Sequence, residues 1–104
     1  MLGKTNRKNF FMVSNHIFAL GLKPRDLAVY CCLVRHADNQ SLTCFPSRKT
    51  IAVECNIDRK TVDAALVALT AIGLVKKVHR YRGDRSKTSN LYVLSNLIEY
   101  ADKA

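Results

Sequence analysis

Residues 48–62 read RKTIAVECNIDRKTV, and this stretch decides the fold because it predicts two helices joined by a tight turn at residues 55–57. Small Ala52 is expected where the helices approach most closely. Four residues later, Asn56 stands where the turn needs a left-handed backbone, which Gly adopts freely and Asn tolerates. A buried stripe then continues at helical spacing along the second helix, through Ile57, Val62, Leu66 and Leu69.

Capping residues set the bounds of this helix pair. Ser47 follows a proline and caps the first helix, which runs to about Glu54. Asp58 caps the second helix, which ends at the residue before Gly73. A helix-turn-helix is therefore expected over residues 47–73.

The segments upstream of this pair predict shorter elements around one buried helix. A helix opened by Lys23-Pro24 should extend to Ala37, and it is apolar nearly all round, as expected for the central helix of the core. The other expected elements are a short strand at 10–13, a brief helix from a Ser14-Asn15 cap through Leu20 to Gly21, and a short strand within 42–45.

Downstream, two β-like segments at 74–81 and 90–94 enclose a polar loop at 82–89, with Leu91 and Val93 on one face. This order predicts a mainly α fold with a small β-hairpin, a winged helix-turn-helix. We expect a single domain over residues 1–104, comprising a basic arm (1–9), the helix-turn-helix (47–73), a wing (74–94) and a C-terminal helix capped by Ser95 (95–104).

Length and composition narrow the class of protein. The 104 residues are 48% apolar and carry a formal net charge of +9, which suits one globular domain with a polyanionic partner, nucleic acid before an acidic membrane. No apolar run approaches the roughly 20 residues of a membrane span, and the polar, basic N-terminus is not a secretory signal. We expect a cytoplasmic bacterial protein.

The four cysteines indicate buried thiols rather than a metal centre. Cys31 and Cys32 are adjacent in a helical stretch, and Cys44 and Cys55 stand alone as small hydrophobic residues. No C-x-x-C pair exists, and the three histidines do not fall at zinc-finger offsets from a cysteine pair. Reduced thiols, no structural zinc and no cofactor are expected.

Four segments resemble a known group of proteins. Residues 46–52, 58–62, 69–75 and 88–92 are similar to winged helix-turn-helix domains of Gram-positive bacteria and their plasmids, phages and transposons. Those domains occur in replication initiators, DnaD-like primosome proteins and small regulators. The resemblance spans about residues 22–94 and implies binding of double-stranded DNA. Asn56 departs from the Gly that is usual in that group, and the substitution is conservative.

The second helix of the pair, the recognition helix of that group, departs further, because the group's members usually carry polar or basic residues in the middle of this helix. The face opposite the core here reads Lys60, Ala64, Val67 and Ala71, a second apolar stripe. Three interpretations stay open for it: a plain surface of small side chains, a dimer interface, or apolar contacts with thymine methyl groups.

Positive charge concentrates on the expected DNA-facing segments. Ten basic and four acidic side chains lie between residues 48 and 87, and residues 76–87 alone carry +5. We expect the wing to contribute at least as much binding free energy as the recognition helix, with Arg82 or Arg85 able to enter a minor groove. Lys4, Arg7 and Lys8 of the arm are further candidates. The predicted DNA-binding residues are Ser47, Arg48, Lys49, Arg59, Lys60, Thr61, Asp63, Lys76, Lys77, Arg80, Arg82, Arg85 and Lys87.

Partners and role follow from this interpretation. A homodimer on a repeated or palindromic site is expected, and other proteins of a nucleoprotein complex are further possible partners. Transcription regulation, plasmid replication and plasmid transfer stay open as roles. The carboxylates form no catalytic pattern, so no enzyme is predicted. The alternative is a protein-interaction module that retains the winged fold, whereas the aromatic residues do not cluster as an RNA-stacking platform.

Overall fold

The structure is a computed structural model that describes residues 10–79 and 90–95. A 3₁₀ helix at Asn15–Leu20 precedes three α-helices. Ser14 caps it by accepting a hydrogen bond from the His16 N–H, and Gly21 ends it in the left-handed conformation, at φ 67°. The α-helices are α1 (Pro24–His36), α2 (Arg48–Cys55) and α3 (Arg59–Ala71). The predicted helices within this part of the chain are therefore confirmed.

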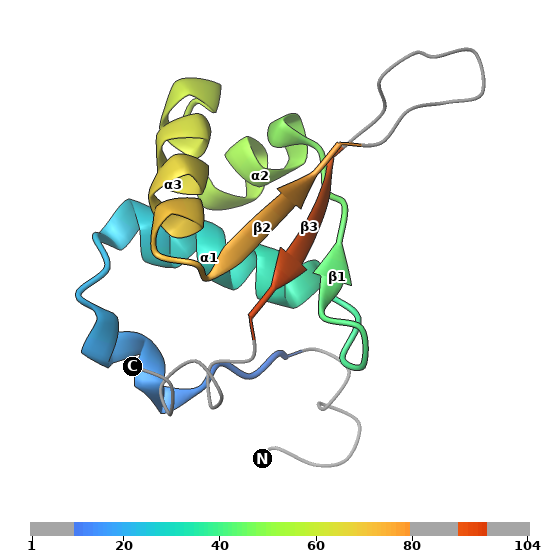
Figure 1. Ribbon diagram of the computed structural model, residues 1–104. Helices are drawn as coiled ribbons and strands as arrows, with labels where there is room; N and C mark the ends of the chain where they lie inside the picture. Colours follow the sequence, from blue (N-terminus) through green and yellow to red (C-terminus); the bar gives the residue numbers. More distant parts are fainter. Residues whose placement is uncertain (1–9, 80–89, 96–104) are drawn as a thin grey trace.

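Three short strands form one antiparallel sheet. They are β1 (Thr43–Cys44), β2 (Val75–Val78) and β3 (Leu91–Leu94), in the order β1-β3-β2. β2 and β3 make a hairpin in which Val75 pairs with Leu94 and Val78 with Leu91, and β1 flanks β3 on its other side (Figure 1). The order of helices and strands confirms the predicted winged helix-turn-helix.

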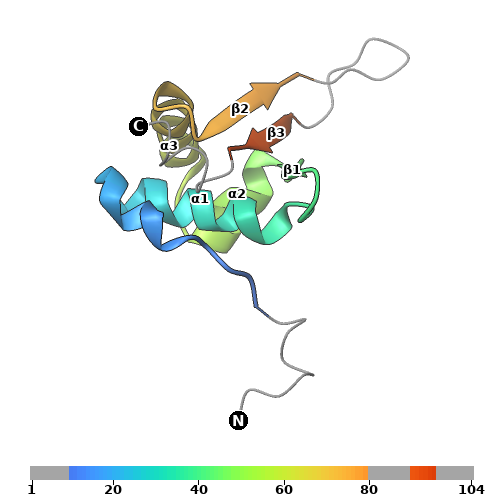
Figure 2. The ribbon, with the colours of Figure 1, turned by 60° about the horizontal axis from the view of Figure 1, so that its bottom comes forward.

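Helix α1 lies at the centre of the core, as predicted. It packs against α2, α3 and β1, and Figure 2 shows it crossing the molecule beside the other two helices. Val29 and Leu33 are fully buried on it. Its C-terminal end is more polar than the prediction implied, since Arg35 and His36 are exposed.

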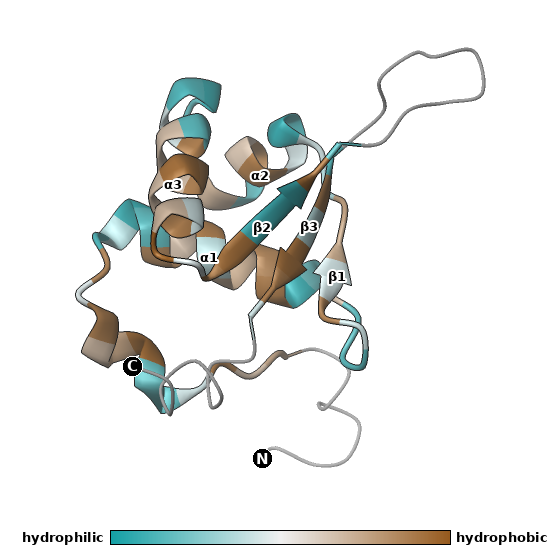
Figure 3. Ribbon diagram, in the orientation of Figure 1, coloured by the Kyte–Doolittle hydropathy of each residue, from teal (hydrophilic) through white to brown (hydrophobic). Residues whose placement is uncertain are grey.

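The inner face of β3 carries alternate side chains into the core. Tyr92 and Leu94 are buried, whereas Leu91 and Val93 share the opposite face and are half-buried. The hydropathy colouring follows this division, with apolar segments meeting between the helices and the sheet and a hydrophilic stretch in the middle of β2 (Figure 3). Among the described residues, no helix is long and apolar enough to cross a membrane.

A clamp at Ser95 holds the end of β3 to the junction between α3 and β2. The Ser95 N–H donates to the Leu74 carbonyl at 2.9 Å, and the Ser95 hydroxyl donates to the Gly73 carbonyl at 2.6 Å. Gly73 adopts a left-handed backbone, at φ 82°, and the Leu74 N–H donates back to the Leu69 carbonyl. The direction of β2 relative to α3 is therefore set by hydrogen bonds on both sides of a short connection.

One predicted element is wrong. Residues 10–13 form no strand, and Phe10, Phe11 and Met12 are exposed. A strand needs a hydrogen-bonded neighbour, and an apolar run without one gains nothing from an extended backbone. Three other predicted segments lie outside the described residues: the basic arm, residues 80–89 of the predicted wing, and the C-terminal helix after Ser95.

The cysteines are free thiols with different degrees of burial. Cys44 is 1% exposed, and burial raises its pKa to about 11, so it behaves as the small hydrophobic residue that was predicted. Cys32 is buried as well, whereas Cys31 and Cys55 are half-buried.

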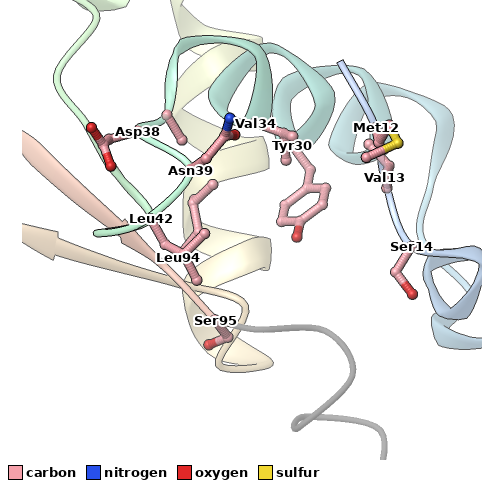
Figure 4. Close-up of a pocket in the computed structure, with 11 residues that line it drawn as sticks. Met12, Val13, Ser14, Tyr30, Val34, Asp38, Asn39, Leu42, Leu94 and Ser95 are labelled. Carbon is pink, nitrogen blue, oxygen red and sulfur yellow. The ribbon is translucent and has the colours of Figure 1, made fainter.

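A cavity of about 220 Å³ lies between the N-terminal segment, α1 and the end of β3. Figure 4 shows the Tyr30 side chain extending into it from α1, between Val13 and Leu94. Burial raises the pKa of this tyrosine above its usual range. The lining includes no residue of α2 or α3, so the cavity is separate from the helix-turn-helix surface.

Candidate nucleic-acid interface

The two helices of the motif begin and end where their capping residues place them. The Ser47 side chain accepts a hydrogen bond from the Thr50 N–H at 3.0 Å at the start of α2. Asn56 ends α2 in the left-handed conformation, at φ 55° and ψ 48°, and the Ile57 N–H then donates to the Ala52 carbonyl at 3.0 Å. The left-handed turn predicted at Asn56 is therefore confirmed.

Helix α3 buries one face and exposes the other. Its buried residues are Val62, Ala65, Leu66 and Leu69, the predicted stripe together with one alanine. On the opposite face Lys60 and Ala71 are exposed, Ala64 is half-buried and Val67 is 69% exposed. The second apolar stripe predicted from the sequence is therefore a solvent-facing feature of this chain.

The N-terminal turn of α3 carries the polar groups of the helix. Asp58 accepts a hydrogen bond from the Thr61 N–H at 2.7 Å, and hydrogen bonds from Thr61 lower the pKa of this carboxyl, helped by the charge of Lys60. Arg59 and Lys60 are exposed, and Thr61 is half-buried. This turn combines two free cationic side chains with the positive end of a helix dipole, a combination that favours contact with an anion.

An ion pair joins the two helices. Arg48 at the start of α2 donates two parallel hydrogen bonds to Asp63 on α3, from Nε to Oδ1 at 2.7 Å and from Nη2 to Oδ2 at 2.6 Å. Both side chains are 48% exposed, so the pair is at the surface. Its bidentate geometry adds a directional contact between α2 and α3 at the surface, beside their buried apolar contacts. Sequence spacing alone did not indicate that these two candidate residues bind each other.

Of the two cations on β2, Lys77 lies beside α3, whereas Lys76, the preceding residue of the strand, is on the other face of the sheet. Lys76 and Lys77 are exposed, opposite Val93 and Tyr92 of β3. Beyond β2, His79 lies 3.1 Å from Asn90, through Nδ1 and Oδ1. A groove of about 340 Å³ runs between α3, the start of α2 and the hairpin. Its lining includes Arg48, Asp63, Val67, Ala71 and Lys77.

Three of the described candidate residues, Arg48, Asp63 and Lys77, line this groove. Ser47, Lys49, Arg59, Lys60, Lys76 and Lys77 are exposed; Arg48 and Asp63 form the ion pair; and Thr61 is half-buried at the start of α3. The wing candidates Arg80, Arg82, Arg85 and Lys87 lie outside the described residues.

A second polar cluster, which the sequence analysis missed, lies on the other side of α2. Glu54 accepts a hydrogen bond from Arg35 at 2.7 Å and lies 3.0 Å from the ring of His36, while the Cys32 thiol donates to it at 3.5 Å. The signal that could have indicated it is the four-residue spacing of Cys32 and His36, which places both on one face of a helix. Among the described residues, this is where potential metal ligands gather.

Comparisons with known proteins agree with the geometry. The crystal structure of a MarR-family transcriptional regulator from Silicibacter pomeroyi superposes with a TM-score of 0.56 at 22% identity, over 85% of this chain and 53% of that one. A possible transcriptional regulator from Methanosarcina mazei Go1 superposes with a TM-score of 0.59 at 12% identity, over 91% and 88%. At these identities the likeness shows the fold, and this chain spans about half the length of the first protein.

Sequence comparison adds the family. No curated protein sequence matches the chain significantly. The profile of a helix-turn-helix domain family, however, matches residues 20–75, more than half of the chain, from the end of the 3₁₀ helix to the first residue of β2. The chain therefore belongs to this helix-turn-helix domain family.

Proposed function

We propose that this chain binds double-stranded DNA, with the N-terminal half of α3 in the major groove and β2 beside the adjacent phosphates. In the DNA-binding form of this motif, the second helix enters the major groove. The observation that carries the proposal is the groove shared by α3, the start of α2 and the hairpin, because its lining brings Lys77 of β2 beside the exposed face of α3.

Two parts of the surface have different tasks in this proposal. Lys49, Lys76 and Lys77 are exposed cations suited to phosphates, which position the protein without reading sequence. Arg59 and Lys60 stand at the N-terminal turn of α3, the part of a recognition helix that reaches base edges. Since the exposed face of α3 beyond that turn carries Val67 and Ala71, sequence discrimination there depends on thymine methyl groups.

We extend the proposal to the biological process in which DNA binding acts. The two solved structures that resemble the chain are described as a transcriptional regulator and a possible transcriptional regulator. Regulation of transcription is therefore the role we favour, with plasmid replication or transfer as the other options. A homodimer on a two-fold symmetric site, in the bacterial cytoplasm, is part of the same proposal.

A salt titration tests the proposal. The affinity for a fluorescent duplex is measured by anisotropy at increasing salt, and duplexes selected from a random pool identify the preferred site. Six to eight phosphate contacts give a slope of about −5 to −7 in a plot of log affinity against log salt. A flat response contradicts binding through this basic surface.

Charge-removal variants test which part of the surface matters more. The double variant Arg59→Ala and Lys60→Ala reports on the recognition helix, and the triple variant Arg80→Ala, Arg82→Ala and Arg85→Ala reports on the wing. We expect the triple variant to weaken binding more, and the reverse order contradicts a dominant wing. Two matched variants complete the series: the pair Lys76→Ala and Lys77→Ala, and Lys23→Ala, an exposed cation at the start of α1 that serves as control.

The alternative function is a protein-interaction module. Val67 favours it, because a valine that is 69% exposed in a groove offers an apolar contact to another protein. This alternative predicts no duplex binding even at low salt, together with self-association or partner binding that Val67→Lys abolishes. Sedimentation of the wild type and the variant, with and without duplex, separates the two functions.

A further inference from the structure

Three chemically reactive side chains meet where α1 passes the end of α2. Cys32 and His36 lie one turn apart on α1, and Glu54 is the penultimate residue of α2. Cys32 Sγ is 3.5 Å from Glu54 Oε1, and His36 Nε2 is 3.0 Å from both oxygens of the same carboxylate. The sulfur, the ring nitrogen and the oxygen all lie within 4.8 Å of one another.

These separations are close to those that a tetrahedral zinc ion imposes on its ligands, and the His36 ring needs the larger adjustment. With Zn–S near 2.3 Å, Zn–N near 2.0–2.1 Å and Zn–O near 2.0–2.2 Å, the sulfur and oxygen should be about 3.6 Å apart and the nitrogen and oxygen about 3.4 Å apart. The Cys32–Glu54 distance of 3.5 Å already fits. The His36 ring must move away from Glu54 by about 0.4 Å, and its side chain, 31% exposed, has room to do so.

The surroundings supply the other features of a metal site. Cys55, the last residue of α2, donates its thiol to the Ala28 carbonyl of α1 at 3.5 Å and offers a second sulfur next to Glu54 in the chain. Arg35 donates to Glu54 at 2.7 Å and is 59% exposed, so it can hold the carboxylate from outside as outer-shell partners do. Cys32 is buried, whereas Glu54 is 27% exposed beside His36, which leaves a path from solvent.

We propose that Cys32, His36 and Glu54 bind a Zn²⁺ ion, with Cys55 or a water molecule as the fourth ligand. The site is distinct from the proposed DNA-binding surface and does not depend on DNA binding. The proposal differs from the expectation of no metal, which rested on the spacing of cysteine pairs and did not consider ligands from two helices. Bound zinc connects the C-terminal half of α1 to the end of α2, directly before the turn at Asn56.

Metal titrations of the whole chain test the site. Co²⁺ serves as a spectroscopic probe for Zn²⁺, because a thiolate bound to Co²⁺ gives a sulfur-to-metal charge-transfer band and a tetrahedral site gives strong visible absorption. We expect one Co²⁺ per chain with both signals, displacement of Co²⁺ by Zn²⁺, and a higher midpoint of thermal unfolding with Zn²⁺ present. Binding without the charge-transfer band, or no binding, overturns the proposal.

Variants assign the ligands. His36→Gln changes a partly exposed ring and should weaken Zn²⁺ binding at least tenfold, since even the loss of an outer-shell partner costs 10- to 100-fold. Cys32→Ser should abolish the charge-transfer band if water is the fourth ligand and reduce it by about half if Cys55 is; an unchanged band overturns the proposal. Matched controls are Cys31→Ser, the neighbouring half-buried thiol, and His16→Gln, an exposed histidine on the 3₁₀ helix. Equal Zn²⁺ affinity in His36→Gln and His16→Gln refutes the site even if Cys32→Ser fails to fold.

Discussion

Replacing Asp63 by asparagine should lower the stability of the fold and raise its affinity for DNA. The substitution removes the bidentate partner of Arg48. It also removes a negative charge from the groove beside Lys77. The connection between α2 and α3 is weakened, while the Arg48 guanidinium becomes free to bind a phosphate. A change with opposite effects on folding and binding distinguishes a positioning role for the pair from a direct role in recognition.

Both effects can be given a size. Because each side chain is 48% exposed, solvent screens the pair, and its loss should cost about 0.5–1 kcal/mol of unfolding free energy. For a domain of this length that lowers the thermal midpoint by about 2–8 °C. One added phosphate contact makes the salt slope steeper by about 0.9, so lowering the salt from about 200 to 50 mM should raise affinity roughly threefold more than in the wild type.

Thermal unfolding by circular dichroism and duplex binding by anisotropy measure the two effects. The matched control is Arg48→Gln, which breaks the same pair without freeing a cation, so it should lower the midpoint equally and leave DNA binding no tighter. If Asp63→Asn binds DNA more weakly than the wild type, Asp63 contacts the duplex itself or the pair must stay intact on DNA. Either result refutes the reasoning.

Three further predictions concern the caps and the turn. Asn56→Ala should cost about 1 kcal/mol, because a left-handed backbone penalises a side chain that cannot hydrogen-bond locally, whereas Asn56→Gly should stay within about 0.5 kcal/mol of the wild type; urea unfolding compares them. Ser47→Ala should cost about 1 kcal/mol by the same measurement, through loss of the hydrogen bond from Thr50. Hydrogen bonds from Thr61 lower the pKa of Asp58 below its ordinary value of 3.8. The ionised carboxylate therefore stabilises the fold above pH 3.8, and this stabilisation is lost as the pH falls through the folded pKa. In Asp58→Asn, the unfolding free energy should fall less between about pH 6 and pH 2 than in the wild type.

Local chemistry explains why much of the fold was predictable from the sequence. Ser47, Asn56 and Asp58 act within a few residues of themselves, so their caps and turn can be recognised without knowing the rest of the chain. The stripe at Val62, Leu66 and Leu69 follows from helical periodicity for the same reason. The exposed character of Val67 also followed, since it lies opposite that stripe.

Contacts between distant segments were not predictable in this way. Arg48 and Asp63 were both expected to contact DNA, but each has its partner fifteen residues away. Glu54 meets Cys32 and His36 only because α1 and α2 cross, a geometry that no spacing rule for cysteine pairs describes. The strand expected at residues 10–13 failed for a related reason, because a strand depends on a neighbour that the local sequence does not specify.

The Ser95 clamp has a consequence for how the chain would meet DNA. Ser95 bonds to both Gly73 and Leu74, so β2 cannot pivot freely about the end of α3. If the chain binds DNA as proposed, the angle between the helix in the groove and the strand beside the phosphates is set before the encounter, and little conformational entropy is lost in aligning them. The duplex must then adapt its groove width and curvature to a fixed template. Preference among duplexes would therefore depend on how easily each sequence deforms as well as on the bases that are touched.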